Sequence, residues 1–176
     1  MKNSSLNFAA SRLRKSPERN VGLDSNISLK QGRNKDLDIG FYKNQHAEIL
    51  NRLSEIENRL DFEISDNIEI LSHELAGLSA RLILHINMEE NLVFPRVRDL
   101  IPSRGLSFHD EYVKKATNLK IAFKEYSSRW SLPSAILERE AEFRKETRWL
   151  IVSLRKLVKK EETEIYSVLE KGTKPV

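Results

Sequence analysis

Residues 71–92 read LSHELAGLSARLILHINMEENL, and this stretch decides the fold. Its leucines recur at alternating steps of four and three residues, which is the period of one face of an α-helix. The face ends in polar residues, and its members are Leu71, Leu75, Leu78, Leu82, His85, Glu89 and Leu92. The stretch therefore predicts a long helix whose inward face carries a histidine and a glutamate. We expect this helix to start near Asp66, which forms a capping pattern with Glu69, and to end near Pro95.

Three other segments repeat this helical period. Residues 39–60 form one, a second begins beside the capping pattern of Ser107 and Asp110 and runs to about Arg129, and a third follows the break at residues 131–134. Four helices of roughly 20 to 35 residues with short connections favour an all-α, antiparallel up-down-up-down four-helix bundle. We place the bundle at residues 39–170, followed by a short tail at residues 171–176.

Composition limits the possible classes of protein. A chain of 176 residues is long enough for one domain with a real core. It has no cysteine, so any metal must be held by nitrogen and oxygen ligands. No apolar run is long enough to span a bilayer and no secretory signal is present, so we predict a cytoplasmic protein without membrane association.

The positive charge of the chain lies in its N-terminal segment. The net charge is +4, and residues 1–38 hold eight Lys or Arg against four acids. We interpret residues 1–38 as a disordered, mildly basic arm. The remaining residues are balanced in charge, and because a duplex-reading domain needs a dense basic face, no nucleic-acid partner is expected.

Each predicted helix offers a histidine or a glutamate to the same interior. His85 and Glu89 are four residues apart, so their side chains lie one above the other and can bind one metal together. An ionised carboxylate in a dry core is costly unless it is paired or bound to a cation. Carboxylates and imidazoles from facing helices form the iron sites of bundle cores. The candidate metal ligands are His46, His85, Glu89, His109 and Glu161.

Two other sequence features bear on this site. The segment from Leu82 to Phe94 matches the segment from Leu154 to Tyr166 at a constant offset of 72 residues, which is a weak internal repeat. In this repeat Leu157 stands where the first copy has His85. His73 precedes His85 by 12 residues, which is about 18 Å along a helix, so we interpret it as a surface residue outside the site.

The string His85-Ile-Asn-Met-Glu89-Glu90-Asn-Leu-Val-Phe94-Pro95 resembles the second-helix motif of the hemerythrin-like (HHE cation-binding) family. The family's first-helix and third-helix histidines match His46 and His109, and its fourth-helix motif matches Glu161-Glu162-Thr-Glu-Ile-Tyr166 in part. The resemblance implies an iron cofactor bridged by Glu89 and Glu161. It also implies that the last family histidine is missing, because Leu157 occupies its place. The iron is then diiron if both sites fill, and a single ion is the alternative.

The resemblance implies a protein that binds or senses oxygen or a related small oxidant, or that handles iron. Its partners would be a metal ion and a small diatomic or peroxide ligand. Oxygen- or peroxide-dependent oxidation at the iron is the enzymatic possibility. The alternative is a degenerate, metal-free helical bundle that acts as a regulatory or interaction module and binds a partner protein.

Overall fold

The computed structural model describes residues 37–101 and 106–172. In these residues the chain forms four helical rods. The first rod is α1 (Ile39–Arg59), and the third is α4 (Leu106–Arg129). The second rod joins α2 (Ile64–Met88), a π-helical turn (Glu89–Val93) and α3 (Phe94–Leu100). The fourth follows the short α5 (Pro133–Glu138) and joins α6 (Glu140–Lys160), a π-helical turn (Glu161–Ile165) and α7 (Tyr166–Gly172).

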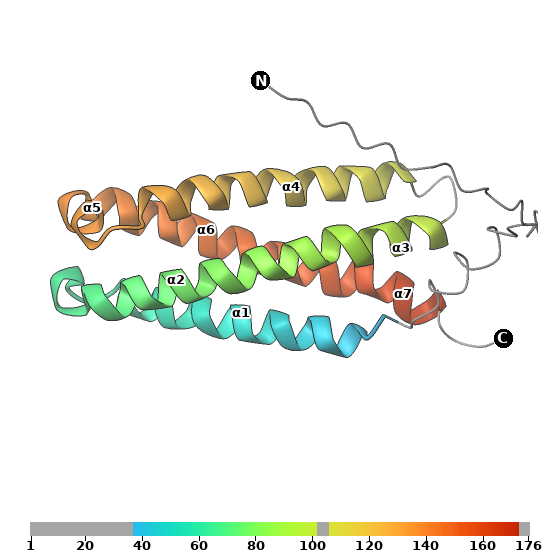
Figure 1. The fold of residues 1–176 in the computed structure, drawn as a ribbon, viewed down its shortest axis with the longest axis horizontal. Helices are drawn as coiled ribbons and strands as arrows, with labels where there is room; N and C mark the ends of the chain where they lie inside the picture. Colours follow the sequence, from blue (N-terminus) through green and yellow to red (C-terminus); the bar gives the residue numbers. More distant parts are fainter. Residues whose placement is uncertain (1–36, 102–105, 173–176) are drawn as a thin grey trace, which may run out of the picture. The chain divides into compact units, whose positions relative to one another are not determined.

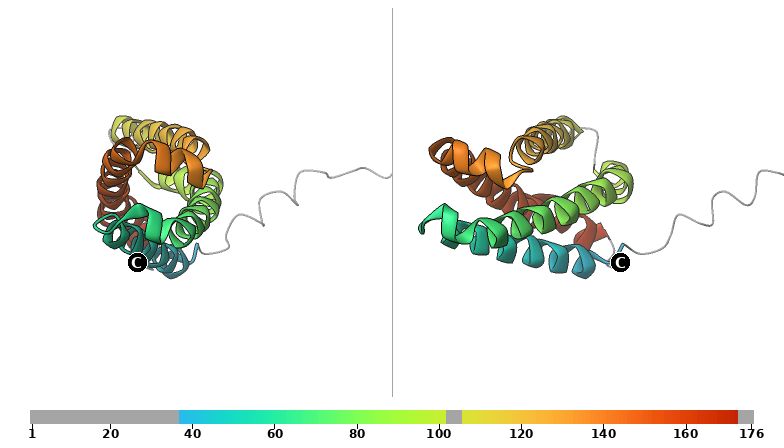
Figure 2. Two further views of the ribbon diagram at one scale, coloured as in Figure 1. Left: turned by 90° about the vertical axis from the view of Figure 1, so that its left-hand side faces the viewer. Right: turned by 60° about the vertical axis from the view of Figure 1, so that its left-hand side comes forward.

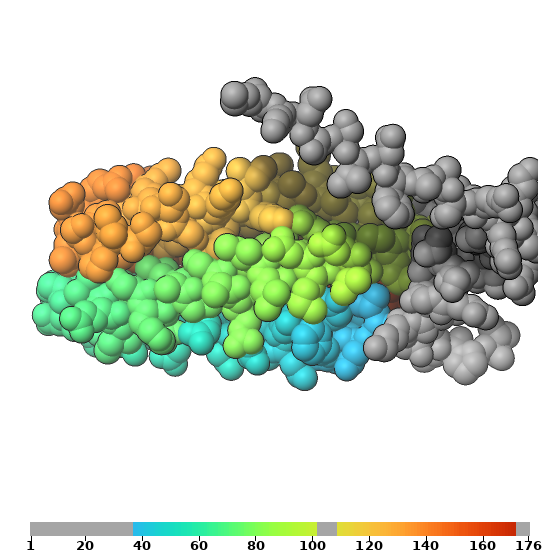
Figure 3. All heavy atoms as spheres, in the orientation of Figure 1, coloured from blue at the N-terminus to red at the C-terminus, as the bar shows by residue number. Residues whose placement is uncertain are grey.

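The rods run antiparallel around one core. α1 packs on α2, α2 on α4, α4 on α6, and α6 on α1, so each rod contacts its neighbours in sequence and the ring closes (Figures 1 and 2). The face shown in Figure 3 is formed by the second rod, with α4 above it and α1 below it. The predicted all-α bundle of four antiparallel rods is confirmed. None of the helices in the described ranges has the length and apolarity needed to cross a membrane.

Two predicted helix starts differ from the structure. α2 begins at Ile64, so Asp66 lies in its first turn and does not cap it. α4 already includes Ser107, which was expected to precede it. The start of α1 has a side-chain cap, because Asp38 accepts a hydrogen bond of 3.2 Å from the backbone N–H of Phe41.

The second rod continues through Pro95, and the prediction that its helix ends there was wrong. Proline has no N–H to donate to the preceding turn. The helix passes this point through the wider π-helical turn, in which the N–H of Phe94 donates to the carbonyl of Glu89, five residues earlier. The extra residue also rotates the inward face. Val93 is fully buried, whereas the predicted core residue Leu92 is 50% exposed.

The fourth rod repeats this irregularity. Its π-helical turn spans Glu161–Ile165, 72 residues after the turn at Glu89–Val93, and each turn begins with a buried glutamate. The internal repeat seen in the sequence is therefore also a repeat of backbone geometry. π-helical turns are rare, and they are frequently found at functional sites.

The core is divided into two apolar clusters. The larger cluster fills the end of the bundle that holds the α1–α2 and α4–α5 connections, and it includes Ile49, Leu53, Leu78, Phe123, Phe143 and Leu154. The smaller cluster fills the other end, and it includes Tyr42, Val93, Phe94, Tyr112, Ile165 and Tyr166. The buried polar residues include Gln45, His46, His85, Glu89 and Glu161. By their positions along the rods, these polar residues form a layer between the two clusters.

The predicted disordered arm lies almost entirely outside the described residues, as does most of the predicted tail. Of the arm, only Leu37 and Asp38 are described. The arm's character stays a prediction.

Candidate metal centre

Four of the five predicted ligand residues meet in the core. His46 comes from α1, His85 from α2, and Glu89 and Glu161 each open a π-helical turn. Each side chain offers one ligand atom, and these four atoms lie within 4.8 Å of one another. All four residues are at most 2% exposed. Three of the four rods thus supply nitrogen and oxygen donors to one buried position in the core.

The imidazole nitrogens are the centre of this group. The Nε2 atoms of His46 and His85 are 2.9 Å apart. The Nε2 of His46 lies 3.1 Å from an oxygen of Glu161, and the Nε2 of His85 lies 3.5 Å from an oxygen of Glu89. The side chains therefore converge as ligands of a common ion would.

The outer nitrogen of each ring is held by an acceptor. The Nδ1 of His46 lies 3.0 Å from the carboxylate of Glu162, which accepts its proton in a hydrogen bond. The Nδ1 of His85 lies 2.9 Å from the side-chain oxygen of Gln45 and donates to it in the same way. In neutral rings this leaves both Nε2 atoms with bare lone pairs that face each other. A cation between the rings, or an extra proton, removes this repulsion.

The ionisation of the centre also favours a cation. Burial, reinforced by the neighbouring His46, lowers the pKa of His85 to about 4. Burial and the charge of Glu161 raise the pKa of Glu89 well above its ordinary value. Burial acts in the same direction on Glu161, but the hydrogen bond from Tyr112, and that from His46 when its ring carries a second proton, outweigh it and lower the pKa of this carboxyl. Without a metal, the surroundings therefore favour the protonated form of Glu89 and the ionised form of Glu161.

Two tyrosines complete the surroundings of the carboxylates. The hydroxyl of Tyr112, from α4, donates to Glu161. The hydroxyl of Tyr166, from α7, donates to Glu89 at 2.5 Å and lies 3.3 Å from the Nε2 of His46. Both tyrosines are at most 1% exposed. Their hydrogen bonds orient the two carboxyl groups, as the outer-shell partners of metal ligands do.

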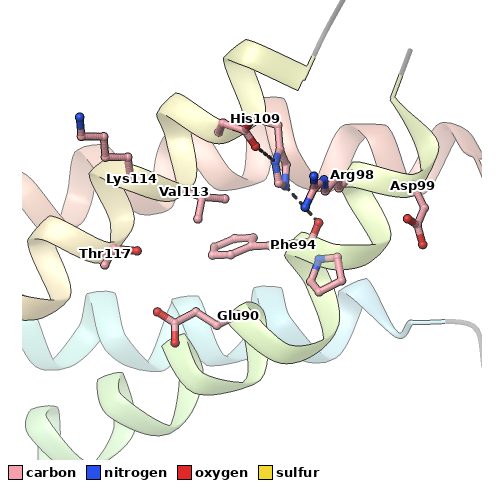
Figure 4. Close-up of a pocket in the computed structure, with 10 residues that line it drawn as sticks. Glu90, Phe94, Arg98, Asp99, His109, Val113, Lys114 and Thr117 are labelled. Atoms are coloured by element: carbon pink, nitrogen blue, oxygen red, sulfur yellow. Dashed lines mark hydrogen bonds and ion pairs between the residues drawn. The ribbon is translucent and has the colours of Figure 1, made fainter. Parts of the chain in front are cut away.

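His109, the fifth predicted ligand, is not among the four converging residues. Figure 4 shows its ring between α4 and α3, beside Phe94. Its Nε2 donates to the carbonyl of Phe94 at 3.0 Å, and its Nδ1 lies 3.2 Å from the carboxylate of Asp110. From α4, Tyr112 reaches the centre instead, three residues further along the helix.

Sequence reasoning missed the residues that surround the ligands, namely Gln45, Tyr112, Glu162 and Tyr166. A signal for Tyr112 was present, since steps of three and four from His109 give Tyr112, Ala116, Leu119, Phe123 and Tyr126. Gln45 and Glu162 each adjoin a predicted ligand, but no spacing rule indicates which neighbour of a ligand turns toward the opposite helix.

Replacing Glu162 with alanine is expected to weaken metal binding by about 10- to 100-fold, because His46 loses the acceptor that fixes its ring. The replacement leaves all four candidate ligands in place. Glu164→Ala is the matched control, since Glu164 lies in the same turn and is exposed. Metal titration of the two variants makes the comparison, and equal affinities would contradict the role given to Glu162.

The comparisons with known proteins bear on this geometry. A family model described as hemerythrin HHE cation binding domain matches residues 37–170, which is more than half of the chain. Neither a curated protein nor a solved structure matches.

Proposed function

We propose that a non-haem iron is held by four residues of this chain, which belongs to the hemerythrin family of HHE cation-binding domains. The four residues are His46, His85, Glu89 and Glu161. The iron would serve to bind or sense oxygen or a related small oxidant, or the protein would handle iron itself.

The observation that carries the proposal is the pair of facing imidazole nitrogens. In neutral rings the two Nε2 atoms, 2.9 Å apart, face each other with lone pairs that repel, and beside them lie two carboxyl groups in a core without a lysine or arginine among the residues described as buried. A divalent cation resolves both problems, because it accepts both lone pairs and balances both carboxylates. The donor set fits iron, since mixed imidazole and carboxylate ligands suit iron or manganese better than structural zinc, and the chain has no cysteine.

We further propose that the centre holds a single ion. The four converging residues are enough for one metal. His109, the third-helix histidine that a second ion would use, is bound to the Phe94 carbonyl, and Leu157 has no donor atom. The proposal of a single ion rejects the diiron site, which the resemblance also allowed.

The surrounding residues support a protected redox site. When bound, ferrous iron would supply electrons to oxygen or to a related oxidant. The apolar clusters on both sides exclude bulk water from the ligands. Tyr112 and Tyr166 hold protons at their hydroxyl oxygens, and Glu162 and Gln45 keep the imidazoles in the tautomer that leaves Nε2 free.

Anaerobic reconstitution with ferrous iron, followed by metal analysis, tests the proposal. We expect about one equivalent of iron per chain and near-ultraviolet ligand-to-metal bands that change on exposure to oxygen or peroxide. Less than about a tenth of an equivalent would contradict an iron site and favour the metal-free module. Two equivalents of iron per chain would contradict the single ion. Bands that change with neither oxygen nor peroxide would contradict a role in binding or sensing these oxidants.

A further inference from the structure

A cavity lies along the contact between α4 and α6, beside the metal centre. Its volume is about 490 Å³, which is within the range of about 300 to 1,000 Å³ that is usual for small-molecule sites. Tyr112, whose hydroxyl donates to Glu161, and Leu157 both line it. None of the four candidate ligands lines it, so a molecule in this cavity would lie next to the centre without displacing a ligand.

The cavity has a cationic end. Lys115, Lys156 and Lys160 are three of its ten lining residues, and none of the ten is an acid. Lys160 also lies over the ring of Tyr112, 5.9 Å from its centroid, which places this end level with the metal centre. Glu111 and Glu164 pair with Lys115 and Lys160 across exposed contacts, but the described ion pairs include none for Lys156. The end therefore keeps an excess positive charge.

The opposite end is apolar. Leu119, Ala122 and Trp149 line it, and Trp149 is 57% exposed, which is unusual for so large an apolar side chain. The hydrogen bond between Tyr126 and Thr147 fixes the pairing of α4 with α6 at this level. From Tyr112 to Ala122 is ten residues of α4, or about 15 Å along the helix. Asn118 and Ser153 also line the cavity, which is thus a long channel with lysines at one end and apolar side chains at the other.

We infer that this cavity, named here the α4–α6 channel, binds a linear amphiphilic anion such as a medium-chain fatty acid. Its carboxylate lies among Lys115, Lys156 and Lys160, and its hydrocarbon tail runs past Leu119 to Trp149. The charge of the lysine end selects an anion, and the apolar walls select a hydrocarbon chain. The head group then lies beside Tyr112, next to the metal centre. Binding itself requires no metal.

Titration of the full chain with hexanoate, octanoate and decanoate tests the inference. The titrations are made with and without iron, and below the micelle concentration of each acid. Each added methylene is expected to tighten binding by up to about fourfold. The tail should also shift the fluorescence of Trp149 to shorter wavelength, and Trp149→Phe should remove this signal. Decylammonium, with a similar tail and the opposite charge, should bind at least about tenfold more weakly than decanoate.

Two variants examine the two ends of the channel. Lys156→Glu should weaken decanoate binding at least about tenfold, whereas Lys145→Glu, an equal charge change on an exposed residue of α6 outside the channel, should leave it unchanged. Ala122→Phe should block the tail, with circular dichroism to verify its fold. The inference is overturned by affinity that does not depend on chain length, by equal binding of decylammonium, or by equal effects of the two lysine variants.

Discussion

Replacing His85 with alanine is expected to reduce bound iron to less than about a tenth of an equivalent per chain and to lower the free energy of unfolding of the iron-loaded protein by about 3 kcal/mol or more. The ring supplies one of two imidazole donors, and its loss also leaves Gln45 without its partner and opens a cavity in the polar layer. A ligand present at 100 times its Kd stabilises a protein by about 2.7 kcal/mol, so loss of the metal alone accounts for most of this effect.

The same helix provides the control for His85. The side chain of His73 is 81% exposed on α2, and His73→Ala should bind iron normally and change stability by no more than about 0.5 kcal/mol. Metal analysis and denaturant unfolding, with and without iron, measure both quantities. In a metal-free interaction module, His85→Ala would instead change the free energy of unfolding by no more than roughly 1 kcal/mol, and that result would contradict a metal centre in this protein.

Replacing Glu89 with glutamine is expected to separate metal binding from the stability of the metal-free protein. Iron affinity should fall by at least about 100-fold, because one of two carboxylate ligands is lost. The metal-free variant should be as stable as the unaltered protein at low pH and more stable at high pH. Glutamine has the shape and charge of the protonated glutamic acid that burial favours at this position.

The sign follows from proton linkage. The pKa of Glu89 is raised in the folded protein, so its stabilising effect is full below the ordinary carboxyl pKa and is lost as the pH rises through the folded value. The contribution of Glu89 to the free energy of unfolding of the metal-free protein should therefore fall as the pH rises, and Glu89→Gln should lack this contribution. Glu69→Gln, an exposed position on α2, is the control. An equal pH profile for Glu89→Gln and the unaltered metal-free protein would show that Glu89 ionises freely.

The sequence predicted the bundle because its signals are periodic. Leucine spacing in residues 71–85 places every inward residue correctly, and the period carries His85 and Glu89 into the core with them. The same reasoning failed after Glu89. A π-helical turn adds one residue to the period, so Val93 is inward where Leu92 was expected. No local pattern indicates such a turn in advance, although the proline at residue 95 shows that a regular α-helix is disturbed there.

The candidate site was predictable to a similar extent. Inward histidines and glutamates on separate helices indicate a shared centre, and four of the five predicted residues converge. The orientation of the His109 ring could not be predicted from the sequence. Whether a ring on α4 turns toward the centre or toward α3 depends on the packing of Phe94. The residues that orient the ligands do so through contacts between different rods. The spacing of residues within one helix gives no information about such contacts.

α4 differs from the other rods in one respect that affects how the protein moves. The four candidate ligands come from the first, second and fourth rods, and α4 reaches the centre only through the hydroxyl of Tyr112. A bound ion would therefore cross-link the first, second and fourth rods, and the third would gain no such link. In amide hydrogen exchange, metal should slow the amides of α1, α2 and α6 far more than those of α4. The bundle would then consist of three rods joined by the ion and a fourth, α4, held by packing and hydrogen bonds, and α4 lines the channel beside the metal.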